Sequence, residues 1–364
     1  MEDTYNLLGH ALRKAVGVLA RQQGRELAAV ATELGAGIVA GSSLKAALDL
    51  DWDDPEQQAH ALVVVLGAVE ACERQLAQGA PGERVPQGAT EALAVARQVQ
   101  AQDVVQRPNG QPALRQGVAP ERRISVEDAD MRHGRKSKSL LVDGYKRHIV
   151  RDLARGLIPA VGVTTANVPE ATVTTQLAAD LAHQGFRLDE LHIDRAYLAS
   201  TLVRERPDDL QIFCKAWPVR SGADGHFPKT AFVLDWETGT IRCPNDVAIP
   251  FQLGATVQFP AATCAPCPLR QRCTSSQHGR SVAIHPDERL LQELRERQQT
   301  PAGRAKLRER TAVEHSLAHV GHWQGRDARY VGVRKNLFDL RRTAAVHNLH
   351  VFMRQPQPTD EAAA

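Results

Sequence analysis

The chain has 364 residues, of which 43% are hydrophobic and 24% charged, a balance that suits a globular protein and excludes a disordered or fibrous one. It contains no run of about 18 apolar residues, and its first residues, MEDTYNLLGH, lack the pattern of a secretory signal. We therefore expect no membrane contact and a cytoplasmic location, in which the six cysteines stay reduced. The net charge of +3 conceals an asymmetry: residues 26–103 carry 12 acidic and 4 basic side chains, whereas residues 304–354 carry 4 and 11. This asymmetry fits either a polyanionic partner or solvated helix faces.

The first region, residues 1–105, is rich in Ala and Leu with apolar residues at helical spacing, which predicts a bundle of three or four helices. Breaks with Gly and Pro separate these helices, and Ser42 or Ser43 and Asp54 are placed to cap two of them. Cys72, in an apolar helix of this region, is predicted to be a packing residue. Residues 106–125 contain RPNGQPALRQGVAPERR, whose many turn formers predict a linker or an arm.

Residues 126–217 alternate between strand and helix patterns. SLLVDGYKRHIVRD and LIPAVGVTTANV predict a hairpin, and residues 170–184 predict an amphipathic helix. A short strand, LDELHID, follows and ends at Asp194; AYLASTLVRER predicts a helix and LQIFCKA a further strand, in which Cys214 is a packing residue. This order predicts an α/β fold with flanking helices around a mixed sheet.

Residues 218–285 interrupt the pattern with short apolar pieces divided by Gly and Pro, which predict a small β-rich insertion. Its four cysteines have the spacing C-x20-C-x2-C-x5-C and are Cys243, Cys264, Cys267 and Cys273. Four thiolates can bind Zn²⁺ tetrahedrally, and the ion would stabilise an insertion that has little core of its own. Small thiols without a metal are an equal alternative, because the outer gaps are looser than in the usual zinc ribbons. Residues 286–354 return to a helical pattern, and residues 355–364 form a polar tail.

Two carboxylates are the candidates for chemistry. Asp194 ends a buried strand, where α/β folds tend to place ligands, and Glu314 lies in a helix beside Arg310. Taken singly, Asp194 is explained as well by a turn or a helix cap, and Glu314 by an exposed helix face. If both reach one site, their oxygens suit Mg²⁺ or Mn²⁺, and a pair of such ions can catalyse phosphodiester displacement. That mechanism usually requires a third acid.

Two basic segments predict contacts with DNA phosphates, which position a duplex without reading its sequence. One is RHGRKSK with the strand that follows it, and the other is ARYVGVRKN, after the helix of Glu314. Their candidate residues are Arg132, Arg135, Lys136, Lys138, Lys146, Arg329, Arg334 and Lys335.

Three segments together resemble bacterial insertion-sequence transposases of the DDE type. They are VEDADMRHGRKSKSLLVDGYKRHIVRD, HIDRAYL and RERTAVEHSLAHVGHWQGRDARYVGVRKNLFDLRRTAAVHNL, and the resemblance extends in order over most of the chain. It implies a ribonuclease H-like core from residues 126–217 and 286–354, with residues 1–105 inserted between the first and second strands of the family fold. It also implies that Asp194 is the second acid of the triad and Glu314 the third, with Arg310 contacting DNA beside it.

The resemblance departs from the family pattern at several positions. Leu307 replaces the family's Tyr, and Gly321 replaces a basic residue. The family's first acid lies on a strand upstream of DTYNLL, a segment that begins here at Asp3, and Asp3 aligns with the start of the helical insertion. We therefore expect the chain to lack its first acid and the DNA-binding module before it.

The function implied by the resemblance is that of a DNA transposase. It would cut element ends and join the freed 3′-hydroxyl to target DNA with Mg²⁺ or Mn²⁺, as a homo-oligomer on DNA. The alternative from a different class is an inactive remnant that only binds DNA. A nuclease unrelated to transposition is a third possibility, distinguished by cleavage without strand transfer.

Overall fold

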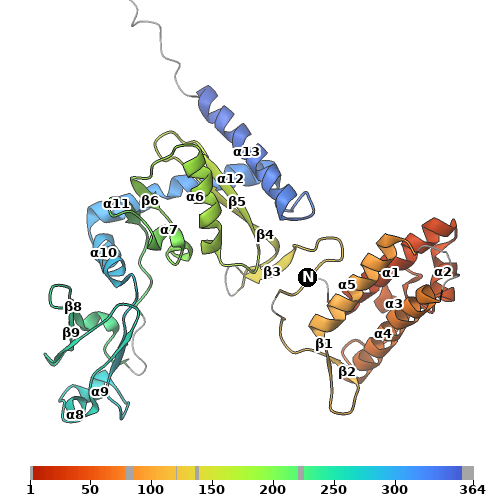
Figure 1. Ribbon diagram of the computed structural model, residues 1–364, viewed down its shortest axis with the longest axis horizontal. Helices are drawn as coiled ribbons and strands as arrows, with labels where there is room; N and C mark the ends of the chain where they lie inside the picture. Colours follow the sequence, from red (N-terminus) through yellow and green to blue (C-terminus); the bar gives the residue numbers. More distant parts are fainter. Residues whose placement is uncertain (1–2, 79–84, 120, 136–138, 220–224, 355–364) are drawn as a thin grey trace, which may run out of the picture. The chain divides into compact units, whose positions relative to one another are not determined.

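The computed structural model describes residues 3–78, 85–119, 121–135, 139–219 and 225–354 (Figure 1). The chain divides into two compact units. The first unit consists of Met1–Val150, Gly156–Pro169 and Ala318–Ala364, and the second of Arg151–Arg155 and Glu170–Leu317. The chain passes from the second unit to the first within α12 (Thr311–Gln324).

Helices form the N-terminal part of the first unit, as the apolar spacing predicts, although the region is divided more finely than expected. Its helices are α1 (Thr4–Gln23), α2 (Leu27–Glu33), the 3-10 turn η1 (Gly37–Val39), α3 (Leu44–Leu48), α4 (Pro55–Ala77) and α5 (Gln87–Asp103). Ser43 and Asp54 cap α3 and α4 through their side chains, which confirms both predicted caps. The helices enclose an apolar core that includes Leu8, Leu12, Leu62, Val65, Leu93 and Val99, together with Cys72.

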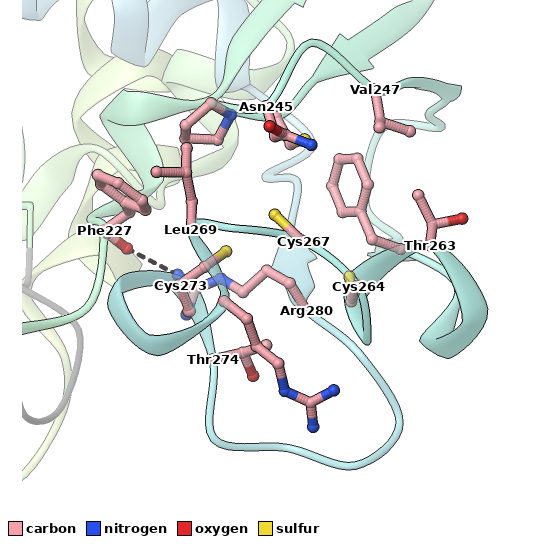
Figure 2. A pocket seen from close by; sticks show the side chains of 14 residues that line it. Phe227, Asn245, Val247, Thr263, Cys264, Cys267, Leu269, Cys273, Thr274 and Arg280 are labelled. Atoms are coloured by element: carbon pink, nitrogen blue, oxygen red, sulfur yellow. Dashed lines mark hydrogen bonds between the residues drawn. The ribbon is translucent and has the colours of Figure 1, made fainter.

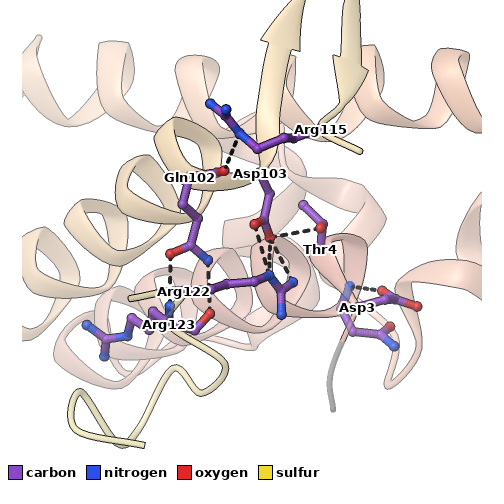
Figure 3. Close-up of polar contacts among 8 residues, drawn as sticks. Asp3, Thr4, Gln102, Asp103, Arg115, Arg122 and Arg123 are labelled. Atoms are coloured by element: carbon purple, nitrogen blue, oxygen red, sulfur yellow. Dashed lines mark hydrogen bonds and ion pairs between the residues drawn. The ribbon is translucent and has the colours of Figure 1, made fainter. Parts of the chain in front are cut away.

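A buried ion pair links the end of α5 to the segment predicted as a linker. The Arg122 guanidinium donates to both oxygens of Asp103 at 2.7–3.0 Å, and the Thr4 hydroxyl donates to the same carboxylate at 2.9 Å (Figure 3). Both charged side chains are less than a tenth exposed. The two short strands β1 (Val104–Gln106) and β2 (Pro112–Leu114) pair antiparallel between them, so this segment is folded against the bundle.

The predicted hairpin lies in the same unit. Strands β4 (Leu141–Val150) and β5 (Ala160–Thr165) pair antiparallel with Tyr145 opposite Thr165 and Val150 opposite Ala160, which confirms the hairpin. Strand β3 (Arg132–Arg135) pairs antiparallel with β4 on its other side. Helix α13 (Val333–Arg354) packs on β5 and buries an apolar cluster that includes Val161, Val163, Val320 and Leu340.

The second unit contains the strand predicted to end at Asp194. Strand β6 (Glu190–His192) pairs in parallel with β7 (Gln211–Phe213). Around them lie η2 (Glu170–Val173), α6 (Thr174–His183), η3 (Arg195–Tyr197), α7 (Thr201–Arg204), α10 (Glu288–Gln299) and α11 (Pro301–Glu309). The helix predicted for AYLASTLVRER is broken, because η3 is a single turn and Ser200 starts the next helix as its N-cap.

The strands pair differently from the single mixed sheet expected around them. Among the described residues the hydrogen-bonded ladders form five small sheets, and the β3-β4-β5 sheet is separate from the β6-β7 pair. The elements are thus both α and β, whereas a continuous ribonuclease H-like sheet stays an expectation of the resemblance.

The insertion is β-rich, as predicted. It contains η5 (Lys229–Ala231), β8 (Val233–Asp235), β9 (Thr240–Arg242), β10 (Ala248–Pro250), β11 (Thr256–Gln258), α8 (Ala261–Cys264), α9 (Arg270–Cys273) and β12 (Ser281–Ala283). A separate small core of Phe232, Ile241, Val257, Phe259, Val282 and Ile284 holds these pieces together. Within the described ranges no helix is long and apolar enough to cross a membrane.

Candidate functional site

Asp194 lies two residues beyond the end of β6. The backbone N–H of Ile193 still donates to the Phe213 carbonyl at 3.0 Å, so the pairing with β7 holds the chain in place up to the acid. The Asp194 carboxylate is the N-cap of η3 and accepts from the Ala196 N–H at 3.4 Å. Its side chain is 55% exposed. Asp194 therefore caps a helical turn, as one interpretation expects, and its carboxylate is also accessible to a ligand.

Glu314 lies in the first turn of α12, and Arg310 lies between α11 and α12. The Arg310 guanidinium donates through Nη2 to Glu314 Oε1 at 2.7 Å, and its Nη1 lies 3.7 Å from Asp194 Oδ2. One cationic group thus pairs with both acids that the sequence singles out. The Glu314 side chain is 59% exposed, so both carboxylates remain open to solvent and to an ion from it.

The donor set fits a hard divalent cation. Two carboxylates from separate elements converge on a position that already favours positive charge, and oxygen ligands are those that Mg²⁺ and Mn²⁺ prefer. Exposed ion pairs of this kind add little stability by themselves. The two acids thus share one cationic partner and remain exposed.

A second group of charged residues adjoins this pair. Because side chains alternate along a strand, Glu190, His192 and Asp194 follow one another on one side of the chain. Glu190 accepts from Lys306 Nζ at 2.8 and 3.1 Å, and this hydrogen bond is the main cause of a lowered pKa for Glu190. His192 Nε2 lies 3.3 Å from Glu190 Oε2 and 3.7 Å from Glu309 Oε2.

The sequence reasoning did not select Glu190, His192 or Glu309. Their donor atoms lie within 4.8 Å of one another. The sequence does contain a signal, the alternation E-L-H-I-D in residues 190–194, which places three polar groups on one side of a short strand. The sequence gives no indication that Lys306 and Glu309 of α11 pair with Glu190 and His192.

Burial raises the pKa of Tyr197 and Cys214, which lie near Asp194, and of Cys72 in the helical bundle. Tyr197 has a raised pKa, chiefly because it is buried and also because of the negative charges of Glu170 and Asp194. Burial, with a contribution from Asp194, raises the pKa of Cys214 to about 12, and burial raises that of Cys72 to about 11. Both thiols are fully buried, as expected of packing residues. Glu170 is a carboxylate near Tyr197 that sequence reasoning did not select.

Some of the predicted DNA-contacting residues already bond to other protein groups, whereas others are exposed. Arg132 pairs with Glu121 at 3.3 Å and donates to two backbone carbonyls, and Lys146 donates to the Val168 carbonyl at 3.0 Å. Exposed positions are occupied by Arg135, Arg329, Arg334 and Lys335, although Arg329 also donates to the Trp323 carbonyl. Lys136 and Lys138 lie outside the described residues.

Asp3 caps the first helix. Its side chain accepts from the Asn6 N–H at 2.8 Å (Figure 3). It also pairs with Lys45 at 2.5 Å. These contacts agree with the interpretation of Asp3 as the start of the helical region.

The four cysteines of the insertion line one cavity of about 30 Å³ (Figure 2). Cys264 ends α8, Cys273 ends α9, and the Cys267 N–H donates to the Cys264 carbonyl at 3.3 Å. Cys243 starts a tight turn in which Asp246 has φ 59°, and the Asp246 N–H donates to its carbonyl at 2.9 Å. Such a volume has room for an ion or a water and is far too small for a drug-sized ligand.

The other cysteines of this cluster raise the pKa of Cys273. Burial is the main cause of the raised pKa of Cys273, and the neighbouring Cys264, Cys243 and Cys267 raise it further, against the opposing effect of Arg280. A raised pKa favours the neutral thiol, so this cluster would hold thiolates only around a bound cation such as tetrahedral Zn²⁺.

The comparison with known proteins gives one family. The family model described as Transposase DDE domain matches residues 251–353, a range that includes Glu314 and three of the four clustered cysteines. No curated protein and no solved structure matches the chain.

Proposed function

We propose that this chain, in which the match over residues 251–353 supports a DDE transposase, supplies Asp194 and Glu314 as two of the three acids that hold Mg²⁺ or Mn²⁺ for DNA strand cleavage and transfer. A transposase of this family implies DNA as the substrate and divalent metal ions in general. The observation that carries the proposal is the Arg310 guanidinium, which pairs with both carboxylates and so brings a strand-end acid and a helix acid to one position.

The residues of the site have separate roles in this proposal. Asp194 is a ligand fixed by the backbone of β6 and η3, and Glu314 is a ligand fixed by the first turn of α12. When bound, the divalent ions activate the attacking water or 3′-hydroxyl and stabilise the leaving oxygen. Arg310 keeps the two carboxylates close before an ion arrives, and its planar guanidinium suits a DNA phosphate.

The test is metal-dependent cleavage of a labelled duplex that carries the element end. We expect Asp194→Asn and Glu314→Gln each to reduce the Mn²⁺-dependent cleavage rate by roughly 100-fold or more, the order of loss when one electrostatic contributor leaves an active site. Asp189→Asn is a matched control, since Asp189 precedes the same strand and is exposed. Cleavage that Asp194→Asn leaves unchanged would refute the assignment.

The same assay separates this function from its alternative, a remnant that only binds DNA. The observation favouring that alternative is that Arg310 already neutralises both acids, so the pair is stable without an ion. Binding without cleavage in any variant or the wild type would support it. Cleavage without a joined strand-transfer product would instead indicate a nuclease.

We further propose that the cysteine cluster binds one structural Zn²⁺ and that the protein acts as a homo-oligomer on DNA. The shared cavity and the mutual effect of the four thiols support the zinc site. The oligomer rests on the resemblance alone, and light scattering of the protein with and without DNA tests it.

A further inference from the structure

Glu190, His192, Lys306 and Glu309 form a charged group that connects α11 to β6, beside the candidate acids. Along the strand, Glu190 pairs with Lys306, His192 faces Glu309, and Asp194 faces Arg310. Glu309 is the last residue of α11 and directly precedes Arg310, which holds both candidate metal ligands. The position of the second acid relative to the first therefore depends on how this end of α11 is held.

His192 is the best fixed member of the group. Its side chain is only 4% exposed, and its ring stacks on Phe213 with centroids 4.7 Å apart and planes at 22°. On the same Phe213 ring lie the Arg297 guanidinium at 4.9 Å and the Lys306 ammonium at 5.5 Å. Few other orientations are open to an imidazole held in this way.

The two nitrogens of His192 have different surroundings. Nδ1 is buried and has no hydrogen-bond partner among the described residues, so a proton there would be an unsatisfied buried donor. The proton is therefore assigned to Nε2, which donates to Glu190 Oε2 at 3.3 Å and faces Glu309 Oε2 at 3.7 Å. Lys306 closes the group from the other side, because it contacts both Glu190 and Glu309.

These contacts favour a hydrogen-bonded fastening over a second metal centre. A metal-binding histidine almost always donates its other N–H to a partner, which Nδ1 lacks here.

We propose that His192 is a positioning residue of the active site. Its Nε2–H holds the Glu190–Lys306–Glu309 group in place, and this group holds the end of α11 and the start of α12. The start of α12 is thereby kept at the distance from β6 at which Asp194 and Glu314 can bind one metal ion. This inference rests on the proposed function, because it concerns the ion held by those two acids.

The experiment measures Mn²⁺ binding to the full-length chain by electron paramagnetic resonance of the free ion, without DNA. His192→Phe keeps a ring to stack on Phe213 but has no donor, and we expect it to weaken Mn²⁺ binding about 10-fold or more with an unchanged melting temperature. His192→Gln places an amide N–H where Nε2 lies, and we expect affinity within about threefold of wild type. His192→Asn reaches only the position of Nδ1, and we expect it to behave like the Phe variant. His183→Gln, at an exposed position at the end of α6, is the control and should bind as wild type does.

Three results would overturn the proposal. The first is wild-type affinity in His192→Phe when Asp194→Asn has lost binding, and the second is equal affinity in the Gln and Asn variants. The third is a bound Mn²⁺ that His192→Phe loses and Asp194→Asn retains, which would make the group a metal centre itself. Unchanged binding in Asp194→Asn is a different result, because it refutes the proposed function.

Discussion

Arg310 shows how much one side chain decides at this site. Neither Asp194 nor Glu314 is buried: their own elements place the backbone of each acid, and Arg310 is the side chain that pairs with both carboxylates. The guanidinium contacts both because it lies where α11 ends and α12 begins. Its planar fork can serve two carboxylates from different directions, which a lysine ammonium on a flexible stem does less well.

Gly303, in the first turn of α11, lies close to the backbone of Arg297 near the end of α10. A Cβ at this position would lie 1.8 Å from the Arg297 carbonyl oxygen and 2.9 Å from the Thr300 hydroxyl. Because the first of these is backbone, we expect Gly303→Ala to destabilise the protein by about 1–3 kcal/mol, the usual cost of overpacking. The measurement is the urea midpoint followed by circular dichroism.

Gly67→Ala provides the control for this change. Gly67 lies within α4, its added Cβ would meet no atom within 4 Å, and alanine should stabilise the helix by about 0.5–1 kcal/mol. A wild-type midpoint in Gly303→Ala would contradict the close approach at the turn.

At the scale of elements, the insertion depends on more than its own packing. Its strands have three residues each, and its core has six buried side chains. Such short strands provide few ladder hydrogen bonds, so a cross-link at Cys243, Cys264, Cys267 and Cys273 would add much of the stability. Cys243 directly follows β9, Cys264 ends α8 and Cys273 ends α9, so an ion held by the cysteines would link these three elements.

We predict one Zn²⁺ per chain, measured by elemental analysis of protein purified without chelator. The paired substitution Cys264→Ser with Cys267→Ser should remove the metal, since it removes two of four ligands, and it should lower the melting temperature as a chelator does for wild type. Cys214→Ser, at a buried thiol outside the cluster, should retain the metal. If wild-type protein purified in the presence of zinc contains no metal, the zinc site is refuted and the four cysteines are packing thiols.

At the scale of the whole molecule, charge is segregated along the chain. The acidic stretch of residues 26–103 belongs to the helical bundle, and the basic stretch of residues 304–354 covers α11, α12 and α13. DNA bound by the basic stretch would release counterions, so its affinity should fall steeply with salt.

We predict that Arg329→Ala, Arg334→Ala and Lys335→Ala combined reduce the slope of log affinity against log salt by about 2–3. Each phosphate contact contributes about 0.9 to that slope on duplex DNA. The measurement is fluorescence anisotropy of a random-sequence duplex over a range of NaCl concentrations. The matched control removes three exposed arginines from the acidic bundle, Arg21, Arg25 and Arg74, and should leave the slope unchanged. An unchanged slope in the first variant would place the DNA elsewhere.

The sequence by itself determined what depends on local pattern. Apolar spacing predicts the helical bundle, alternation predicts the β4-β5 hairpin, and cap chemistry places Ser43 and Asp54. Motif order led to the DDE resemblance, which the match over residues 251–353 supports. These features are readable because each needs only residues near one another in the chain.

Only the tertiary structure decided which distant side chains meet. Asp194 and Glu314 are 120 positions apart, and nothing in either segment indicates that one guanidinium pairs with both. The contacts of His192 with Glu309, and the shared cavity of Cys243 with three later cysteines, arise in the same way. The physical reason is that the packing of α11 and of the insertion fixes these distances, and packing sums many weak contacts that no local pattern encodes.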